Sequence, residues 1–217
     1  MYQPASGLDH RRRRYDADRL LAVAVQVFIR RGYEATTMAA LGEAAGLGKS
    51  SIYHHFPSKE AILRRALGRA LDALFAILAE EPATVGPAAG RLEHLLRRTV
   101  EVLVEELPYV TLLLRVRGNS TTELWALERR RQFDHEVADL VAAAARSGEL
   151  RPDLDPGLGA RLLLGMVNSI SEWYRPGGPL TAAGLASATA GIGLHGVVGR
   201  ARKGGAAGPA TADPRPR

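Results

Sequence analysis

The chain has 217 residues, of which 46% are hydrophobic and 24% are charged, a balance typical of a globular protein with a buried core. It contains no cysteine, which excludes a disulfide framework, a thiolate nucleophile and a zinc–thiolate site. The formal net charge is +6, and the excess lies in two tails, because residues 1–14 carry +3 and residues 200–217 carry +4. Such basic tails favour a polyanionic partner, although the C-terminal one could also be merely solubilising.

The sequence predicts neither a signal peptide nor a membrane span. The first ten residues are polar, and the run Arg11-Arg12-Arg13-Arg14 is not followed by an uninterrupted apolar stretch. The longest apolar runs, such as residues 110–114, are far shorter than the about 20 residues that cross a bilayer. We therefore expect a cytoplasmic protein.

Apolar residues recur at three- and four-residue spacing along most of the chain, which predicts an all-α protein. Residues 1–14 are expected to form a flexible basic arm, and the first helix to run from about Asp16 to Arg31 and end at Gly32. One buried stripe of that helix should contain Leu21, Ala24, Val25 and Phe28.

Two short helices joined by a glycine-containing turn are expected next. One follows Thr36-Thr37 and ends at Gly46, and the other covers about residues 48–55. Gly42 costs the first of them of order 1 kcal/mol relative to alanine, which indicates a close packing contact. The layout is that of a helix-turn-helix, whose second helix can enter the major groove of DNA, although other small helical hairpins share this spacing.

Ser58 should cap a fourth, long helix that reaches about Glu80, and the segment 82–90, rich in proline, glycine and alanine, should mark a boundary. Further helices are predicted at about 90–106, 108–116, 120–147, 153–174 and 181–199. We therefore expect a DNA-binding domain over residues 15–75, a second domain over 76–199 and a disordered basic tail over 200–217.

The segment from residue 15 to 75 contains, in order, Leu20-Leu-Ala-Val-Ala, Phe28, Arg31-Gly-Tyr, Thr36-Thr-Met, Leu41, Ala44-Ala-Gly46-Leu and Lys49-Ser-Ser-Ile-Tyr53-His-His-Phe56-Pro-Ser-Lys59-Glu60-Ala-Ile-Leu63. It resembles the N-terminal domain of TetR-family transcriptional regulators. The resemblance implies a three-helix DNA-binding domain, linked by a long fourth helix to a larger helical domain for ligand binding and dimerisation. It also implies a repressor that a ligand releases from DNA. Gly48 stands where the family often has a capping serine.

The resemblance also implies DNA contacts. Thr37 should touch a phosphate and Lys59 the DNA backbone, while the groove should be faced by Lys49, Ser50, Tyr53 and His54. Tyr53 has a competing role as a wedge against the domain core. We hypothesise that the basic arm, through Arg11, Arg12, Arg13 and Arg14, reaches phosphates or an adjacent minor groove.

Motifs of catalysis are incomplete in this sequence. Gly48-Lys49-Ser50 lacks the upstream glycine of a phosphate-binding loop, because Glu43 occupies that place. His135-Glu136 lacks the second histidine of a zinc protease, where Asp139 stands instead. Several helical glutamates are interpreted as solvated faces: Glu105, Glu106, Glu123, Glu128 and Glu136. We therefore expect that the protein is not an enzyme and that it has no catalytic residue, metal site or cofactor.

Large side chains of the second domain belong either to its core or to a ligand pocket. The pocket candidates are Tyr109, Trp125, Phe133, Asn168 and Trp173. Arg115, Arg117 and Arg131 could meet an anionic ligand or form exposed salt bridges. The segment from Asn168 through Trp173-Tyr-Arg-Pro-Gly-Gly-Pro-Leu-Thr181 resembles the joint before the last helix in a subset of family members. Members of that subset often respond to acyl-CoA thioesters or to related fatty, steroid or aromatic acid derivatives, which favours an amphiphilic effector.

Apolar stripes on the last two predicted helices favour a homodimer, although they could also serve only the core of one chain. The interface candidates are Leu162, Met166, Ile170, Leu185 and Ile192. A dimer would bind a pseudo-palindromic operator with half-sites about one helical turn apart. The expected function is a ligand-responsive DNA-binding repressor, and the alternative is a helical ligand-binding protein without sequence-specific DNA binding.

Overall fold

The structure, a computed structural model, describes residues 6–196 and, apart from Lys49, the side chains from residue 17 onward. Within this range the regular structure is helical throughout: α1 (Ser6–Arg31), α2 (Met38–Ala45), α3 (Lys49–His55), α4 (Lys59–Ile77), α5 (Glu81–Thr84), α6 (Ala88–Glu105), α7 (Leu107–Arg115), α8 (Thr121–Arg146), α9 (Pro156–Trp173) and α10 (Ala182–His195). No helix of the described part is both long and apolar enough to cross a membrane. The prediction of an all-α protein is confirmed.

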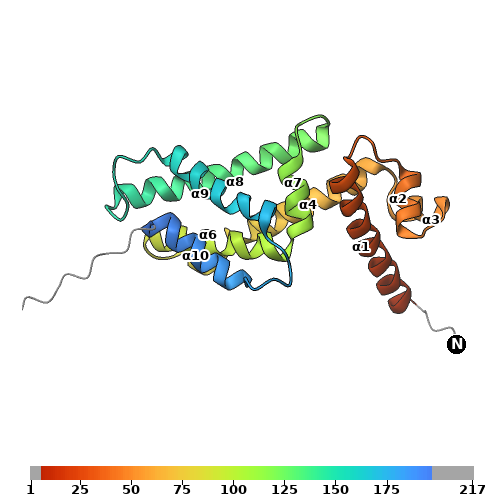
Figure 1. The fold of residues 1–217 in the computed structure, drawn as a ribbon, viewed down its shortest axis with the longest axis horizontal. Coiled ribbons are helices and arrows are strands. Elements are labelled where there is room, and N and C mark those ends of the chain that lie inside the picture. The colour runs from red at the N-terminus through yellow and green to blue at the C-terminus, as the bar shows by residue number, and fades with distance from the viewer. Residues whose placement is uncertain (1–5, 197–217) are drawn as a thin grey trace, which may run out of the picture.

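The molecule is elongated, and the long helix α4 joins its two parts (Figure 1). We call α1 to α3 the head and α5 to α10 the body. In the body α6 packs against α10, α8 packs against α9, and α6 also contacts both α8 and α9. The helix α4 packs against α1 of the head and against α6, α7 and α8 of the body. Head and body therefore share one helix and one continuous hydrophobic core.

Local capping explains where the helices of the head begin and end. The Thr37 hydroxyl accepts a hydrogen bond from the Ala40 N–H at 3.1 Å and so caps α2. Gly46 ends α2 with φ +67°, a left-handed conformation that favours glycine. The Ser58 hydroxyl accepts from the Ala61 N–H at 3.1 Å and begins α4. These hydrogen bonds join residues close in sequence, and the predicted limits of α2, α3 and α4 agree with the structure to within about three residues.

The first helix is longer than predicted. The sequence predicted a start near Asp16 and a flexible arm over residues 1–14, whereas α1 begins at Ser6 and includes the run Arg11–Arg14. Between Leu8 and Arg31 no glycine or proline interrupts the chain, so nothing local ends the helix. The predicted buried stripe is confirmed, because each of its members is at most 2% exposed: Leu21, Ala24, Val25 and Phe28.

The closest approach in the helix-turn-helix occurs at Gly42 of α2. A Cβ atom added there would lie 3.1 Å from the carbonyl oxygen of Leu47, in the turn that leads to α3. At Gly68, in the middle of α4, an added Cβ would meet only Trp125, at 4.0 Å. The close contact expected from the sequence at Gly42 is therefore present.

Gly42→Ala and Gly68→Ala form a matched pair. We expect Gly68→Ala to raise the free energy of unfolding by about 1 kcal/mol, the helix-propensity difference between the two residues. Gly42→Ala should instead lower it by about 1 kcal/mol, because crowding against the backbone outweighs the same gain. It should also weaken DNA binding, since the Leu47 carbonyl positions α3. Urea unfolding and DNA titration check both; equal stabilisation by the two variants would contradict the prediction.

Candidate nucleic-acid interface and ligand pocket

The short helix α3 buries one side and exposes the other. Ile52 is 1% exposed and anchors α3 in the core of the head. On the opposite side Ser50, Tyr53 and His54 are exposed, and Tyr53 keeps 46% of its surface open. Tyr53 also lines a groove between α2 and α3 with Met38, so it borders the rest of the head while much of its surface stays open. The structure thus brings the described groove-facing candidates together on one surface.

Thr37 and Lys59, the two residues predicted to contact the DNA backbone, belong to the same part of the head. Thr37 is exposed, and its hydroxyl oxygen is already used in capping, which leaves its hydrogen for a phosphate. Lys59 has a structural role that was not predicted, because its Nζ donates to the carbonyl oxygens of Tyr33 at 2.9 Å and Glu34 at 3.4 Å. It also lies 4.2 Å from the centre of the Tyr33 ring. Lys59 therefore holds the α1–α2 loop against α4, and its third ammonium hydrogen remains for DNA.

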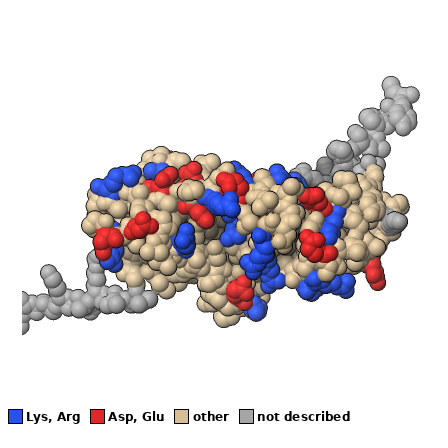
Figure 2. Space-filling view, turned by 90° about the horizontal axis from the view of Figure 1, so that it is seen from above, with Lys and Arg blue, Asp and Glu red and all other residues tan. Residues whose placement is uncertain are grey.

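The other cationic candidates, Lys49 and Arg11–Arg14, have side chains outside the described residues. On the face that Figure 2 shows, acidic and basic side chains alternate, and neither sign forms a broad surface.

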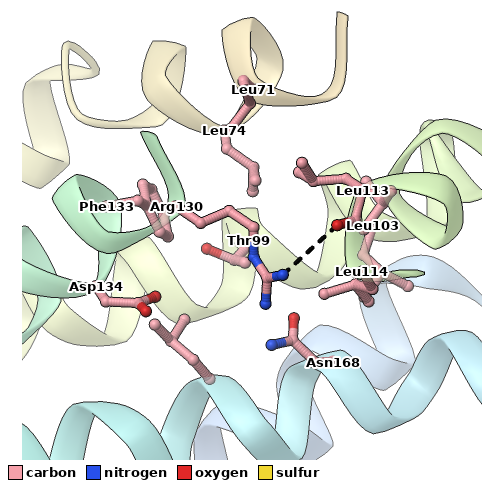
Figure 3. Close-up of a pocket in the computed structure, with 12 residues that line it drawn as sticks. Leu71, Leu74, Thr99, Leu103, Leu113, Leu114, Arg130, Phe133, Asp134 and Asn168 are labelled. Carbon is pink, nitrogen blue, oxygen red and sulfur yellow. Dashed lines mark hydrogen bonds between the residues drawn. The ribbon is translucent and has the colours of Figure 1, made fainter. Parts of the chain in front are cut away.

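A pocket lies in the body among α4, α6, α7, α8 and α9 (Figure 3). Its walls are mostly apolar, and it is lined by Leu71, Leu74, Thr99, Leu103, Val110, Leu113, Leu114, Arg130, Phe133, Asp134, Leu164 and Asn168. The volume of the cavity is only about 40 Å³. A small-molecule ligand needs several hundred Å³, so the pocket must widen to take one.

The pocket continues into a surface groove between α8 and α9. Four residues line both and form what we call the neck: Arg130, Asp134, Leu164 and Asn168. The groove holds about 410 Å³ and adds three cationic or titratable side chains, Arg131, His135 and Arg161. An apolar cavity thus opens through a polar neck onto a surface rich in arginine.

The neck contains two opposite charges without a direct ion pair. Burial lowers the pKa of the Arg130 guanidinium, and the Asp134 carboxylate opposes that shift. Burial likewise raises the pKa of Asp134, and Arg130 is the largest opposing influence. Nη1 of Arg130 donates to the Leu113 carbonyl at 3.5 Å, a long hydrogen bond. Arg130 is half-buried and Asp134 is exposed, so neither charge is fully withdrawn from water.

The structure places two of the five predicted ligand residues, Phe133 and Asn168, in the pocket wall. The other three lie elsewhere, so the prediction was wrong for this pocket. Tyr109 is buried and accepts from Arg69 at 3.4 Å, Trp125 packs beneath the Arg64 guanidinium at 3.3 Å, and Trp173 is half exposed at the end of α9. Arg130 and Asp134 also line the pocket and were not predicted, because their position beside Phe133 is the only indication that the sequence offers.

Glu123, at the start of α8, is another correction. It was interpreted as part of a solvated face, but it is 5% exposed and accepts three backbone N–H bonds, from Arg117 at 2.9 Å, Gly118 at 2.7 Å and Asn119 at 2.9 Å. Burial raises the pKa of Glu123, and the three bonds together lower it by more, so the net pKa is below the ordinary value. Glu123 thus fixes the α7–α8 loop.

That loop region connects the body to the head. The Glu60 carboxylate, in the first turn of α4, accepts from the Thr122 hydroxyl at 2.9 Å and from the Thr121 hydroxyl at 3.2 Å. At the end of α7, Arg115 donates to the Ile29 carbonyl of α1 at 2.9 Å. The start of α8 and the end of α7 are therefore both bonded to elements that carry the helix-turn-helix.

Glu123→Gln should lower the free energy of unfolding by about 2 kcal/mol at neutral pH, because a neutral amide accepts these N–H bonds less strongly than a carboxylate. The pKa of Glu123 is lowered in the folded state, so its contribution is complete above the unfolded-state pKa and disappears as the pH falls through the folded-state value. The difference between the two proteins should therefore shrink in acid. Urea unfolding from pH 7 to pH 3 checks this, and a difference independent of pH would contradict it.

The outer faces of α9 and α10 are apolar in part. Leu162 is 61% and Ile192 47% exposed, as expected for interface residues, and Met166 is half-buried. Ile170 and Leu185 are at most 7% exposed and belong to the core of the chain itself, so the prediction was wrong for these two. The apolar stripe winds gradually around each of these two helices, and α6 packs against part of it.

These features define a class of protein: a helix-turn-helix DNA-binding regulator with a helical second domain that contains a ligand pocket. Two family models match the chain, "Bacterial regulatory proteins, tetR family" over residues 20–66 and "Tetracyclin repressor-like, C-terminal domain" over residues 85–197. The chain is 31% identical over 166 residues to the HTH-type transcriptional repressor KstR2 of Mycobacterium tuberculosis H37Rv, a match that covers 75% of this chain and 83% of KstR2.

Solved structures agree. SCO3833, a member of the TetR family from Streptomyces coelicolor A3, is 58% identical with a TM-score of 0.79, over 83% of this chain and 91% of that one. AibR, solved in complex with isovaleryl coenzyme A and operator DNA, is 24% identical with a TM-score of 0.70, over 82% and 97%. The chain belongs to the TetR family, and it is a DNA-binding transcriptional repressor.

Proposed function

We propose that the effector of this repressor is an acyl-CoA thioester and that the protein acts as a homodimer on a pseudo-palindromic operator. The effector class is supported by three connected regions of the body. An apolar pocket opens through a polar neck into a groove that is lined by Arg131, His135 and Arg161. An acyl-CoA has the same order of parts: an apolar chain, a polar thioester and pantetheine, and a polyanionic nucleotide.

The charges of the groove match the nucleotide end of such a ligand. Arg131 and Arg161 lie on neighbouring helices that both border the groove, and guanidinium groups bind phosphates through paired N–H bonds. The walls beyond the neck, including Leu103 and Phe133, suit an acyl chain. AibR, which shares the fold, binds isovaleryl coenzyme A in its solved complex.

Release from DNA would follow from the position of α8. This helix contributes Arg130, Phe133 and Asp134 to the pocket, and its first turn is bonded to Glu60 of α4 through Thr121 and Thr122. A ligand that widens a space of about 40 Å³ has to displace the surrounding helices. A displacement of α8 would pull on α4 and so change the spacing of the two α3 helices in the dimer.

A homodimer is supported by the exposed apolar residues of the last two helices. Leu158 and Leu162 of α9 and Ile192 of α10 are each about half exposed or more. Two such faces related by a two-fold axis would form a four-helix interface. Because the relatives are transcriptional regulators, we infer that the protein acts through binding rather than catalysis, in the cytoplasm, where its operator would lie.

Selection of bound duplexes from random DNA tests the operator, and release from the selected duplex tests the effector. We expect enrichment of a pseudo-palindrome with half-sites about one helical turn apart, and a dimer in sedimentation. Acyl-CoA esters should release the duplex at lower concentrations than coenzyme A or the free acid. Enrichment of no sequence would indicate a ligand-binding protein without specific DNA binding, and failure of all esters, from short to long, would refute the effector class.

Thr122→Val tests the connection through α8. The variant removes one hydroxyl donor and keeps the shape of the side chain, so DNA affinity and effector affinity, each measured alone, should stay within about twofold. The factor by which the effector weakens DNA binding should become about fivefold smaller, because one charge-assisted hydrogen bond between α8 and α4 is lost. Thr84→Val, on α5, is the control. An unchanged factor in Thr122→Val would contradict this route.

A further inference from the structure

The Arg130 guanidinium has few protein partners among the described residues around the pocket. Figure 3 shows it projecting from α8 into the middle of the cavity, between the apolar walls and the Asn168 side chain. The ion pairs found in the described part of the chain do not include it. Its one hydrogen bond there is the long one to the Leu113 carbonyl. A guanidinium has five N–H donors, so most of them face the cavity without an acceptor.

Arg130 is half-buried, so its guanidinium is partly withdrawn from water in the free protein. A ligand that excludes the remaining water has to supply well-placed acceptors in its place. An arginine keeps its charge under these conditions, because its ordinary pKa is far above neutral. The neck is therefore suited to ligand atoms that accept hydrogen bonds and tolerate or carry negative charge.

The neighbours of Arg130 define which atoms these are. Asn168 projects from α9 toward the same part of the cavity and can donate through its amide. The Thr99 hydroxyl already donates to the Leu95 carbonyl at 2.7 Å, so toward a ligand it offers only an acceptor. Arg130 and Asn168 thus supply donors from two helices at the point where pocket and groove meet.

We propose that Arg130, together with Asn168, selects acyl thioesters that carry a second oxygen in a 1,3-relation to the thioester carbonyl, as 3-oxoacyl and 2-carboxyacyl thioesters do. This inference rests on the proposed acyl-CoA effector. With the acyl chain in the pocket and the nucleotide in the groove, the first carbons of the acyl chain lie in the neck. A 1,3-dicarbonyl group presents two neighbouring oxygens, as a carboxylate does, and so matches the paired donors of a guanidinium.

A saturated acyl chain would fit the same space less well. It would place a methylene group against the guanidinium, which would exclude water from the charge without supplying an acceptor. The second oxygen therefore acts as a selection criterion, because every acyl chain displaces water from Arg130 and only an oxygenated chain replaces it. Arg131 lies in the groove outside the neck and should contribute equally to the binding of every CoA ester.

The test compares esters that differ only in the second oxygen: 3-oxohexanoyl-CoA with hexanoyl-CoA, and methylmalonyl-CoA with propionyl-CoA. The readout is the concentration that releases half of the protein from its selected operator. For at least one pair, wild type should need about tenfold less of the oxygenated ester. The pair that shows this ratio identifies whether a ketone or a carboxylate supplies the second oxygen.

Three variants separate selection from general binding. Arg130→Met should reduce the ratio to within about twofold of one, and Arg130→Lys, which keeps the charge without the paired donors, should reduce it as well. Arg131→Met should weaken both members of a pair equally and keep the ratio. A thermal unfolding curve shows whether each variant is folded, and Arg130→Lys serves if Arg130→Met is not.

A wild-type ratio near one in both pairs, or a ratio that survives both Arg130 variants, would overturn the inference while leaving the acyl-CoA effector in place. If no CoA ester released wild type, the effector class would fail and this inference with it. That result is distinct, because release would then be absent instead of unselective.

Discussion

The rest of this structure depends on one constraint: the long helix α4 is buried against the head and against the body at the same time. The helix α4 packs against α1 in the head and against α6, α7 and α8 in the body, and its buried residues form part of a single core. Because close-packed cores do not deform continuously, neither part can shift without a response at α4. The head is therefore positioned by the body, and a protein built this way can convert a change in the body into a change in the spacing of DNA-binding helices.

The helix α8 gives the body a second fixed connection to α4, the helix that joins it to the head. Its middle supplies Phe133, whose ring lies 5.8 Å from that of Phe75 on α4, and its first turn is bonded to Glu60. Glu123 holds the preceding loop through three backbone N–H bonds, so the start of α8 is a rigid attachment. The pocket between these elements is nearly closed, so under the proposed function the effector binds a widened form of it and thereby favours that form.

Polarity at the neck explains how a mostly apolar pocket can be specific. Leucine walls contribute affinity in proportion to the area they bury and discriminate poorly between chains of similar size. Arg130 and Asn168 contribute direction, because a donor that loses its partner in a dry site costs more than a methylene gains. Arg130 is half-buried in the free protein, and it becomes selective when a bound ligand excludes the remaining water.

The sequence by itself determined the helices and the class of DNA-binding unit. Caps such as Thr37 and Ser58 and turn glycines such as Gly46 act through hydrogen bonds between near neighbours, so their effect is encoded locally. The close contact at Gly42 could be predicted for the same reason, since the turn follows within a few residues.

Only the tertiary structure decided which side chains face the pocket. Three consecutive arginines on α8 have three different surroundings: Arg129 lies over the Phe75 ring at 3.8 Å, Arg130 enters the cavity, and Arg131 lines the groove. Likewise Leu162 is exposed while Ile170, on the same helix, is buried. Successive helical residues point about 100° apart, and the packing of α4, α6, α7 and α9 decides which direction is inward. That decision depends on contacts between segments far apart in the chain, which a pattern of neighbouring residues does not contain.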